Sequence, residues 1–339
     1  LTGEVASTYI LLRTLEERIA VARVNEIIQR RGLEITSVRF RNDLTTELDP
    51  SQARVLLKNT QALIPRLEIA LRQTENGLSQ MLGMTPGGVR SVIGGGSTIP
   101  ETPATVAVGL PADLLRRRPD IRQAEYLAAS QSAAIGIAKA DLYPALRLGG
   151  SIGYTADSTG DLVNSDSLFS IAGIGFGWNI LNYGRIKNRV RANDARFQQT
   201  ITNYQNAVLN AAREVENSQT AFLRSHEEVK FLQEAATSAR RAVDIALIQY
   251  RDGLSSYTSV LLTQRSLLLQ EDLLTSARGR LAGNLVGLYR ALGGGWQLRE
   301  GDEFISEDAR ESMRQRTDWG DMLDEGQPVD NEPGENSNL

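Results

Sequence analysis

Side chains able to carry out chemistry are few and widely separated along this sequence. It contains no cysteine and a single histidine, His226. This histidine lies on the polar side of an expected long helix, beside two glutamates, and no other residues at metal-binding spacing accompany it. We therefore interpret it as a solvated surface residue. We expect no catalytic residue, no metal ion and no cofactor, so the protein is predicted not to be an enzyme.

Three other short motifs allow a structural as well as a functional interpretation. The run Gly94-Gly95-Gly96-Ser97 lacks the lysine and the preceding strand of a phosphate-binding loop, so we interpret it as a linker. The three arginines at 116–118 are interpreted as a solvated helix start. Asp43, Asp49 and Asp252 lie near expected chain reversals, where aspartate commonly serves as a turn or capping residue.

Composition excludes several classes of protein. The 339 residues are 6% aromatic with a mean hydropathy of -0.26, which suits long amphipathic helices better than a compact enzyme. The net charge of -4 is uneven, because the chain from Glu300 onward holds thirteen acidic residues and three arginines. No basic stripe with interleaved aromatic residues is present, so nucleic acid is not an expected partner. No run of 18 apolar residues occurs, so no transmembrane helix is expected.

The helical elements that would position these residues occur twice in the sequence. Residues 1–83 and 211–293 align at a constant offset of 210 without a gap. Identical pairs include Arg30-Arg31/Arg240-Arg241, Leu44/Leu254, Leu63/Leu273, Gly77-Leu78/Gly287-Leu288 and Leu82-Gly83/Leu292-Gly293. The register continues through a turn and ends on the same Leu-Gly stop. The sequence therefore predicts a duplicated helical hairpin whose two turns lie at the same end.

Each hairpin is expected to be long. From Ile186 to Tyr250 there is neither proline nor glycine, and apolar or small residues recur at helical spacing. Asp252-Gly253 interrupts the pattern, and a return helix is expected from about Ser256 to Leu292. Such a pair cannot cover its own apolar stripe, which indicates a bundle or an assembly of hairpins.

Between the hairpins lies a segment with the alternation of β-strands. Residues 146–154 and 169–180 each place apolar side chains on one face and small or polar ones on the other, with Tyr154 and Trp178 near the ends. Strands of this length and pattern are typical of a transmembrane β-barrel. A soluble hairpin packed against the helices is the equal alternative, since a single strand pair is a weak barrel signal. The polar loop at 155–166 would face outward.

Two expectations concern the ends of the chain. The second hairpin is preceded by about 125 residues without a counterpart before the first hairpin, and the first residue is Leu1, so we expect a piece of a longer protein. The acidic residues 299–339 have few apolar side chains and are expected to be largely disordered beyond Asp318. A short helix is predicted at 307–316.

Four motifs resemble the outer-membrane factor (TolC/OprM-like) family of tripartite efflux and secretion systems. They are Leu-Pro-Ala-Asp-Leu-Leu-Arg-Arg-Arg-Pro-Asp at 110–120, Ala-Lys-Ala-Asp-Leu-Tyr-Pro at 138–144, Trp-Asn-Ile-Leu-Asn-Tyr-Gly-Arg at 178–185 and Ala-Leu-Gly-Gly-Gly-Trp at 291–296. With the duplicated hairpins, the resemblance covers most of residues 1–298 in the family's order.

The resemblance implies a mainly α fold with a small β contribution. Long antiparallel hairpins would form a tunnel through the periplasm, and the strand pair would enter a trimeric transmembrane β-barrel in the bacterial outer membrane. Each complete protomer of this family gives four strands to a shared barrel of twelve. The protein would be a homotrimeric, passive exit duct that works with a periplasmic adaptor protein and an inner-membrane pump. The alternative function is a soluble periplasmic coiled-coil scaffold or adaptor.

The resemblance also carries candidate site residues. In the family, the hairpin turns form the periplasmic tip, where the tunnel closes and the adaptor docks. Asp49 and Tyr250 match positions that hold the closed aperture together, whereas Ser255 and Leu262 depart from the family pattern, and Asp43 replaces a usual glycine. The expected adaptor-docking residues are Asp43, Leu44, Gly253 and Leu254. The expected outward, lipid-facing side of the barrel strands comprises Leu148, Ile152, Ile174 and Phe176.

The predicted organisation has six segments. They are a first hairpin at 1–84, a linker at 85–109, a helical segment at 110–145 whose arginines at 116–118 also pack between subunits, the strand pair at 146–180, the second hairpin at 181–298 and the acidic tail at 299–339.

Overall fold

The computed structural model describes residues 1–94, 98–103, 118–155, 158, 167–294 and 305–318. Residues 1–293 form one compact unit and residues 294–339 a second. The elements of the first unit are α1 (Thr2–Arg41), α2 (Leu48–Met81), α3 (Val89–Ile93), α5 (Pro119–Ala140), β1 (Ala145–Tyr154), β2 (Leu168–Gly177), α6 (Arg185–Arg251) and α7 (Tyr257–Ala291). None of the helices in the described part of the chain combines the length and the hydrophobicity needed to cross a membrane.

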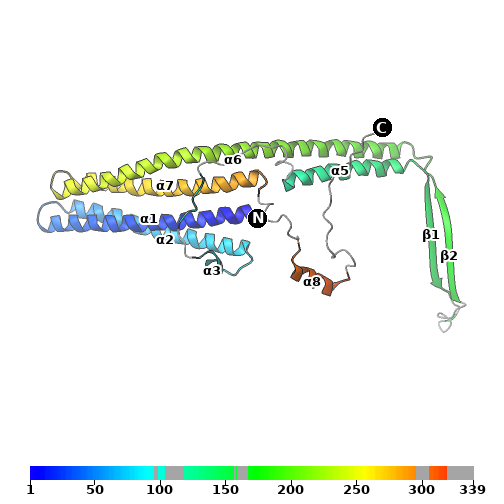
Figure 1. The fold of residues 1–339 in the computed structure, drawn as a ribbon, viewed down its shortest axis with the longest axis horizontal. Coiled ribbons are helices and arrows are strands. Elements are labelled where there is room, and N and C mark those ends of the chain that lie inside the picture. The colour runs from blue at the N-terminus through cyan, green and yellow to red at the C-terminus, as the bar shows by residue number, and fades with distance from the viewer. Residues whose placement is uncertain (95–97, 104–117, 156–157, 159–166, 295–304, 319–339) are drawn as a thin grey trace. The chain divides into compact units, whose positions relative to one another are not determined.

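Two long hairpins dominate the first unit (Figure 1). α1 packs against α2, α7 against α6, and α1 against α7, so the hairpins meet through α1 and α7 while α2 and α6 lie at the two edges. With 67 residues, α6 is about 100 Å long at the usual rise per residue. Its N-terminal half packs against α5 and its C-terminal half against α7.

The core consists of small clusters spaced along these helices. Leu15, Ile19 and Leu67 pack between α1 and α2, whereas Phe222 and Leu288 pack between α6 and α7. The cluster nearest the turns joins three helices and contains Ala53, Ala246, Tyr250, Tyr257 and Val260. Apolar residues at helical spacing thus hold each hairpin together, as the sequence pattern predicted.

The duplication is confirmed in the hydrogen bonds of the turns. Leu44 N donates to Arg39 O at 2.9 Å, and Leu254 N donates to Gln249 O at 2.8 Å, again at an offset of 210. Asp43 and Gly253 occupy the same left-handed position, with φ of 58° and 79°. This arrangement is a Schellman motif, in which the residue after the helix end must turn left-handed. Both turns lie at the same end of the hairpin pair (Figure 1).

The strand pair extends from the opposite end of α5 and α6. β1 and β2 pair antiparallel from Ala145↔Gly177 to Tyr154↔Leu168. The prediction that the second strand continues to Ile180 is wrong, because its partner β1 begins only at Ala145, directly after Pro144, which has no N–H to pair. The indole of Trp178 donates instead to Leu142 O at 3.0 Å. Most of the predicted outward loop, at 156–157 and 159–166, lies outside the described residues.

The segment predicted as a plain linker at 85–109 is tied to the first hairpin. It contains α3, and Arg13 donates to Ile93 O at 2.8 Å. Further along, Ile99 N donates to Glu17 Oε2 at 3.4 Å. Residues 95–97 of the glycine run and residues 104–117, which include Arg116 and Arg117, lie outside the described part.

The second unit contains α8 (Glu307–Arg316), at the position that the sequence predicted. Ser306 caps this helix by accepting a hydrogen bond from Ala309 N at 3.3 Å. The predicted disorder beyond Asp318 concerns residues outside the described range.

Candidate functional site

Asp49 and Tyr250 lie in direct contact at the turn end of the hairpins. Asp49 belongs to the first turn of α2 and Tyr250 to the last turn of α6, 201 positions further along the chain. The Tyr250 hydroxyl donates to Asp49 Oδ2 at 2.8 Å, and Thr45 Oγ1 donates to the same oxygen at 2.5 Å. The structure therefore brings together the two residues expected to act as a pair, and adds Thr45, which sequence reasoning missed.

Arg39 strengthens this contact from α1. Its Nη1 donates to the carbonyl oxygens of Tyr250 and Arg251, at 2.8 and 2.9 Å. A cation at these unpaired carbonyls also complements the negative end of the α6 dipole. The guanidinium carbon of Arg39 lies 4.8 Å from the centre of the Tyr250 ring, within the range of a cation–π contact. Residues of α1, α2 and α6 thus converge on one tyrosine.

The Tyr250 hydroxyl stays protonated well above physiological pH. Only 2% of Tyr250 is exposed, and burial, followed by the hydrogen bond to Asp49, raises its pKa to about 12. Burial likewise raises the pKa of Tyr257, whose ring meets that of Tyr250 edge-on at 5.3 Å. Tyr250 therefore acts only as a donor to Asp49 at physiological pH, whereas the Tyr257 hydroxyl has no hydrogen-bond partner among the described residues.

The turns themselves present exposed side chains. Leu44 is 64% exposed and Leu254 is 78% exposed, and each follows directly on its left-handed residue, Asp43 or Gly253. Because Arg39 and Tyr250 link the helices that precede the two turns, these four residues lie close to the candidate pair. Of the two positions that depart from the family pattern, Leu262 is 59% exposed, and Ser255 has a buried hydroxyl without a partner in the described part of the chain.

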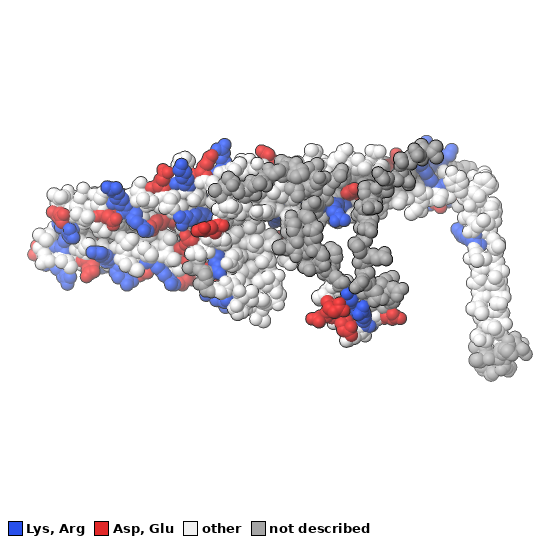
Figure 2. Space-filling model, viewed as in Figure 1, with Lys and Arg blue, Asp and Glu red and all other residues white. Residues whose placement is uncertain are grey.

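The strand pair shows a second candidate surface. The register places Leu148 opposite Ile174 and Leu146 opposite Phe176, so these side chains share a face with Ile152. Leu148, Ile152, Ile174 and Phe176 are between 68% and 82% exposed. The alternative of a soluble hairpin packed on the helices is wrong, since that packing would bury them. Figure 2 shows the strand pair nearly free of charge, whereas the hairpins carry both signs.

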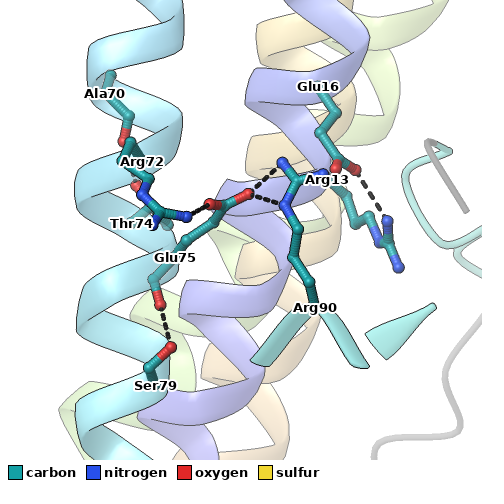
Figure 3. A network of polar contacts seen from close by, with 8 residues as sticks. All are labelled: Arg13, Glu16, Ala70, Arg72, Thr74, Glu75, Ser79 and Arg90. Atoms are coloured by element: carbon teal, nitrogen blue, oxygen red, sulfur yellow. Dashed lines mark hydrogen bonds and ion pairs between the residues drawn. The ribbon is translucent and has the colours of Figure 1, made fainter. Parts of the chain in front are cut away.

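Two buried charge clusters were missed in the sequence. Glu75, 2% exposed, accepts hydrogen bonds from Arg72 at 3.0 Å and from Arg90 Nε at 2.7 Å (Figure 3). The hydrogen bonds to Glu75 also raise the pKa of Arg90. Glu75 thereby attaches α3 to α2. Beside it, Arg13 of α1 pairs with Glu16 at 2.8 Å.

Arg118 corrects the interpretation of the arginine run. It is 8% exposed rather than solvated, and it donates to Asp120 at 2.8 Å, Glu214 at 2.7 Å and Ala291 O at 2.9 Å. These hydrogen bonds connect the start of α5, the middle of α6 and the end of α7. The hydrogen bond from Arg118 lowers the pKa of Asp120. Arg118 thus has a structural role within the chain.

His226 also differs from the prediction. It is half-buried, its ring lies edge-on against Phe222 at 4.8 Å, and its Nε2 is buried without a partner among the described residues. The solvated surface position expected for this histidine is therefore wrong. Its contact with an aromatic core residue gives it a packing role.

Known proteins match this chain over both hairpins and the strand pair. The model of the family described as outer membrane efflux protein matches residues 1–84 and 110–294. The chain is 30% identical over 299 residues to nodulation protein T of Rhizobium leguminosarum bv. trifolii, covering 87% of this chain and 63% of that protein. It is 29% identical to the pyoverdine export outer membrane protein OpmQ of Pseudomonas putida, covering 88% and 62%. The chain thus spans less than two thirds of the length of these relatives.

Solved structures agree. The chain superposes on the outer-membrane channel OprN with a TM-score of 0.80 and 29% identity, covering 87% of this chain and 66% of that one. For the open state of the Neisseria gonorrhoeae MtrE outer membrane channel, the values are 0.70 and 25%, with coverages of 86% and 66%. The predicted fold, a helical tunnel with strands for a transmembrane barrel, and the predicted location in the outer membrane with periplasmic helices are confirmed. OpmQ is thus named as an export protein and OprN and MtrE as channels, and the chain belongs to the outer membrane efflux protein family.

Proposed function

We propose that this chain is the larger part of a passive exit duct through the outer membrane, assembled as a homotrimer and served by a periplasmic adaptor and an inner-membrane pump. The observation that carries the proposal is the exposed apolar face of the strand pair. Four large side chains in open solvent would be costly in water, but they match the outward face of a barrel strand in lipid. The alternative scaffold or adaptor would have no use for this face.

The helical part supports assembly in the same way. α2 and α6 lie at the two edges of the hairpin pair, and both expose large apolar side chains. On α2 these include Val55 and Ile69, and on α6 they include Leu223 and Phe231, all more than half exposed. A closed ring of copies, in which α2 of one copy meets α6 of the next, would cover them. Two strands per chain cannot close a barrel, so further strands must complete it.

Within this duct we assign the aperture to Asp49 and Tyr250. A threefold axis turns one pair into a ring of three, and a ring of carboxylates held by buried donors can constrict a water-filled tunnel. The exposed turn residues Asp43, Leu44, Gly253 and Leu254 are assigned to adaptor docking, because they project beyond the aperture. The relatives' names describe pyoverdine export and toluene efflux, so what they share is export rather than one cargo.

A charge on the apolar strand face tests the proposal. Ile174→Asp should reduce the yield of folded trimer in outer-membrane fractions of cells making the full-length protein, because a charged side chain facing lipid is destabilising. At mid-bilayer an acid costs less than the about 2–4 kcal/mol of Arg or Lys. Ser151→Asp is the matched control, since Ser151 lies in the same strand pair on the opposite face. The proposal requires a clear deficit for Ile174→Asp alone. Equal yields for the two variants would contradict it.

A further inference from the structure

One charged residue stands in the strand pair. Arg147 is the only Lys, Arg, Asp or Glu within β1 and β2. It lies directly opposite Gly175, on the face turned away from Leu148 and Ile174. It is exposed, and no carboxylate in the described part of the chain pairs with it; the nearby Asp141 pairs with Arg189 at 2.9 Å.

The surroundings of Arg147 are unusually bare. On its own face the neighbours are Gly149, Gly173 and Gly177, and a Cβ added at any of these three would meet nothing within 4 Å. No side chain from these positions covers the guanidinium or narrows the space in front of it. Larger residues of this face, such as Phe169, lie toward the far end of the strands. The guanidinium therefore faces open space at the strand end joined to the helices.

From this arrangement we infer that Arg147 forms a ring of three guanidinium groups inside the barrel and makes the duct prefer anionic solutes. The inference rests on the proposed function, since the ring requires three copies around a lumen. If one strand face meets lipid, the opposite face lines the lumen, and that is the face of Arg147. Rings of arginine or lysine are a known means of selecting anions in pores.

The dimensions allow such a ring to act on the whole lumen. With strands about 4.8 Å apart and tilted by about 40°, a barrel of twelve strands has a radius of roughly 12 Å. An arginine side chain reaches about half of that distance, and the Debye length is about 8 Å at physiological ionic strength. Every path through this level therefore passes within about one Debye length of a guanidinium. Three such charges should concentrate a monovalent anion on the order of fivefold over bulk solution.

A cysteine reporter beside the ring measures this potential directly. The 339 residues contain no cysteine, and Gly149→Cys adds a side chain where a Cβ meets no neighbour, two positions from Arg147 on the same face. We would measure its modification in reconstituted full-length trimers by an anionic and a cationic methanethiosulfonate reagent, with any cysteine elsewhere replaced by serine. Leu148→Cys, on the opposite face, is the matched control. The ratio of the two rate constants reports the local charge and does not depend on the aperture at the hairpin turns.

The inference predicts faster modification of Gly149→Cys by the anionic reagent. Adding Arg147→Gln should lower the ratio of anionic to cationic rate by about fivefold or more, Arg147→Glu should reverse the preference, and Arg147→Lys should retain it. High salt should weaken the effect. A ratio unchanged by Arg147→Gln, with Gly149→Cys still reactive, would overturn the anion ring alone. Equal reactivity of Gly149→Cys and Leu148→Cys would contradict the proposed duct, and the ring with it.

Discussion

At the scale of single residues, the turn end of the hairpins depends on one tyrosine. Tyr250 is buried, its hydroxyl donates a hydrogen bond to Asp49, and its carbonyl oxygen accepts one from Arg39. A hydrogen bond to a charged group contributes about 1.5–3 kcal/mol, more than a neutral one. The contact therefore adds to the apolar cluster near the turns in holding α2 to α6.

The protonation of Tyr250 gives a pH prediction. Its pKa is raised from the ordinary 10.0 to about 12, so its stabilising effect is complete below pH 10 and is lost as the pH rises from there through about 12. The thermal midpoint of the full-length trimer, followed by circular dichroism, should fall more steeply over this window than that of Tyr250→Phe. Parallel curves for the two proteins would show that the hydroxyl does not contribute in this way.

The two turns offer a matched pair of substitutions. Asp43 occupies a left-handed position with φ of 58°, and Gly253 occupies the equivalent one with φ of 79°. A left-handed conformation costs a residue with a Cβ about 1–2 kcal/mol. We expect Asp43→Gly to raise the thermal midpoint and Gly253→Ala to lower it. The same direction of change in both variants would contradict this assignment of strain.

At the scale of elements, the contact between α1 and α7 contains several polar pairs away from the turns. Asn25 of α1 donates to Glu271 of α7 at 2.6 Å, and Arg240 of α6 pairs with the same carboxylate. Arg18 makes a two-point contact with Asp272, at 2.7 and 2.9 Å. Apolar clusters hold each hairpin together and, near the turns, also join α2 to α6 and α7, whereas paired charges and amides hold α1 to α7 further along the helices. Changes at this contact should therefore depend on whether the polar groups are satisfied.

Gln264 of α7 tests whether buried polar groups without partners lower the stability of the bundle. It is 1% exposed, and both atoms of its amide lack a hydrogen-bond partner among the described residues. A buried polar group without a partner costs about 1–3 kcal/mol, so Gln264→Leu should raise the thermal midpoint. Asn25→Leu should lower it, because that change leaves Glu271 with one partner fewer. Destabilisation by Gln264→Leu would indicate that a bound water satisfies the amide.

The sequence predicted most of the elements and few of the long-range contacts. Helix ends were predictable because turn and stop residues recur at the offset of 210. The end of β2 was not, because alternation continues through Trp178 after the partner strand has ended. The burial of Arg118 was not predictable, because its partners Glu214 and Ala291 lie 96 and 173 positions away. A local pattern shows that a charged residue starts a helix, but it does not show which distant carboxylate will bury it.

At the scale of the whole molecule, the proposed duct has separate regions for membrane insertion, selectivity and closure. The strand pair carries the apolar face and Arg147, and the hairpin turns carry the proposed aperture. The link between them is α6, which runs from the end of β2 to Tyr250. The proposed aperture would open by separation of the hairpins at their turns, which the hydrogen bond between Tyr250 and Asp49 opposes.

The resting conductance of the reconstituted full-length trimer therefore tests the central claim most directly. Asp49→Ala combined with Tyr250→Phe removes the carboxylate and its donor, and should raise the fraction of open channels about tenfold or more, given the strength of a charged hydrogen bond. Tyr257→Phe is the control, since that hydroxyl has no partner among the described residues and its loss should leave conductance unchanged. A double variant that assembles as a trimer and conducts no more than the parent protein would contradict the account.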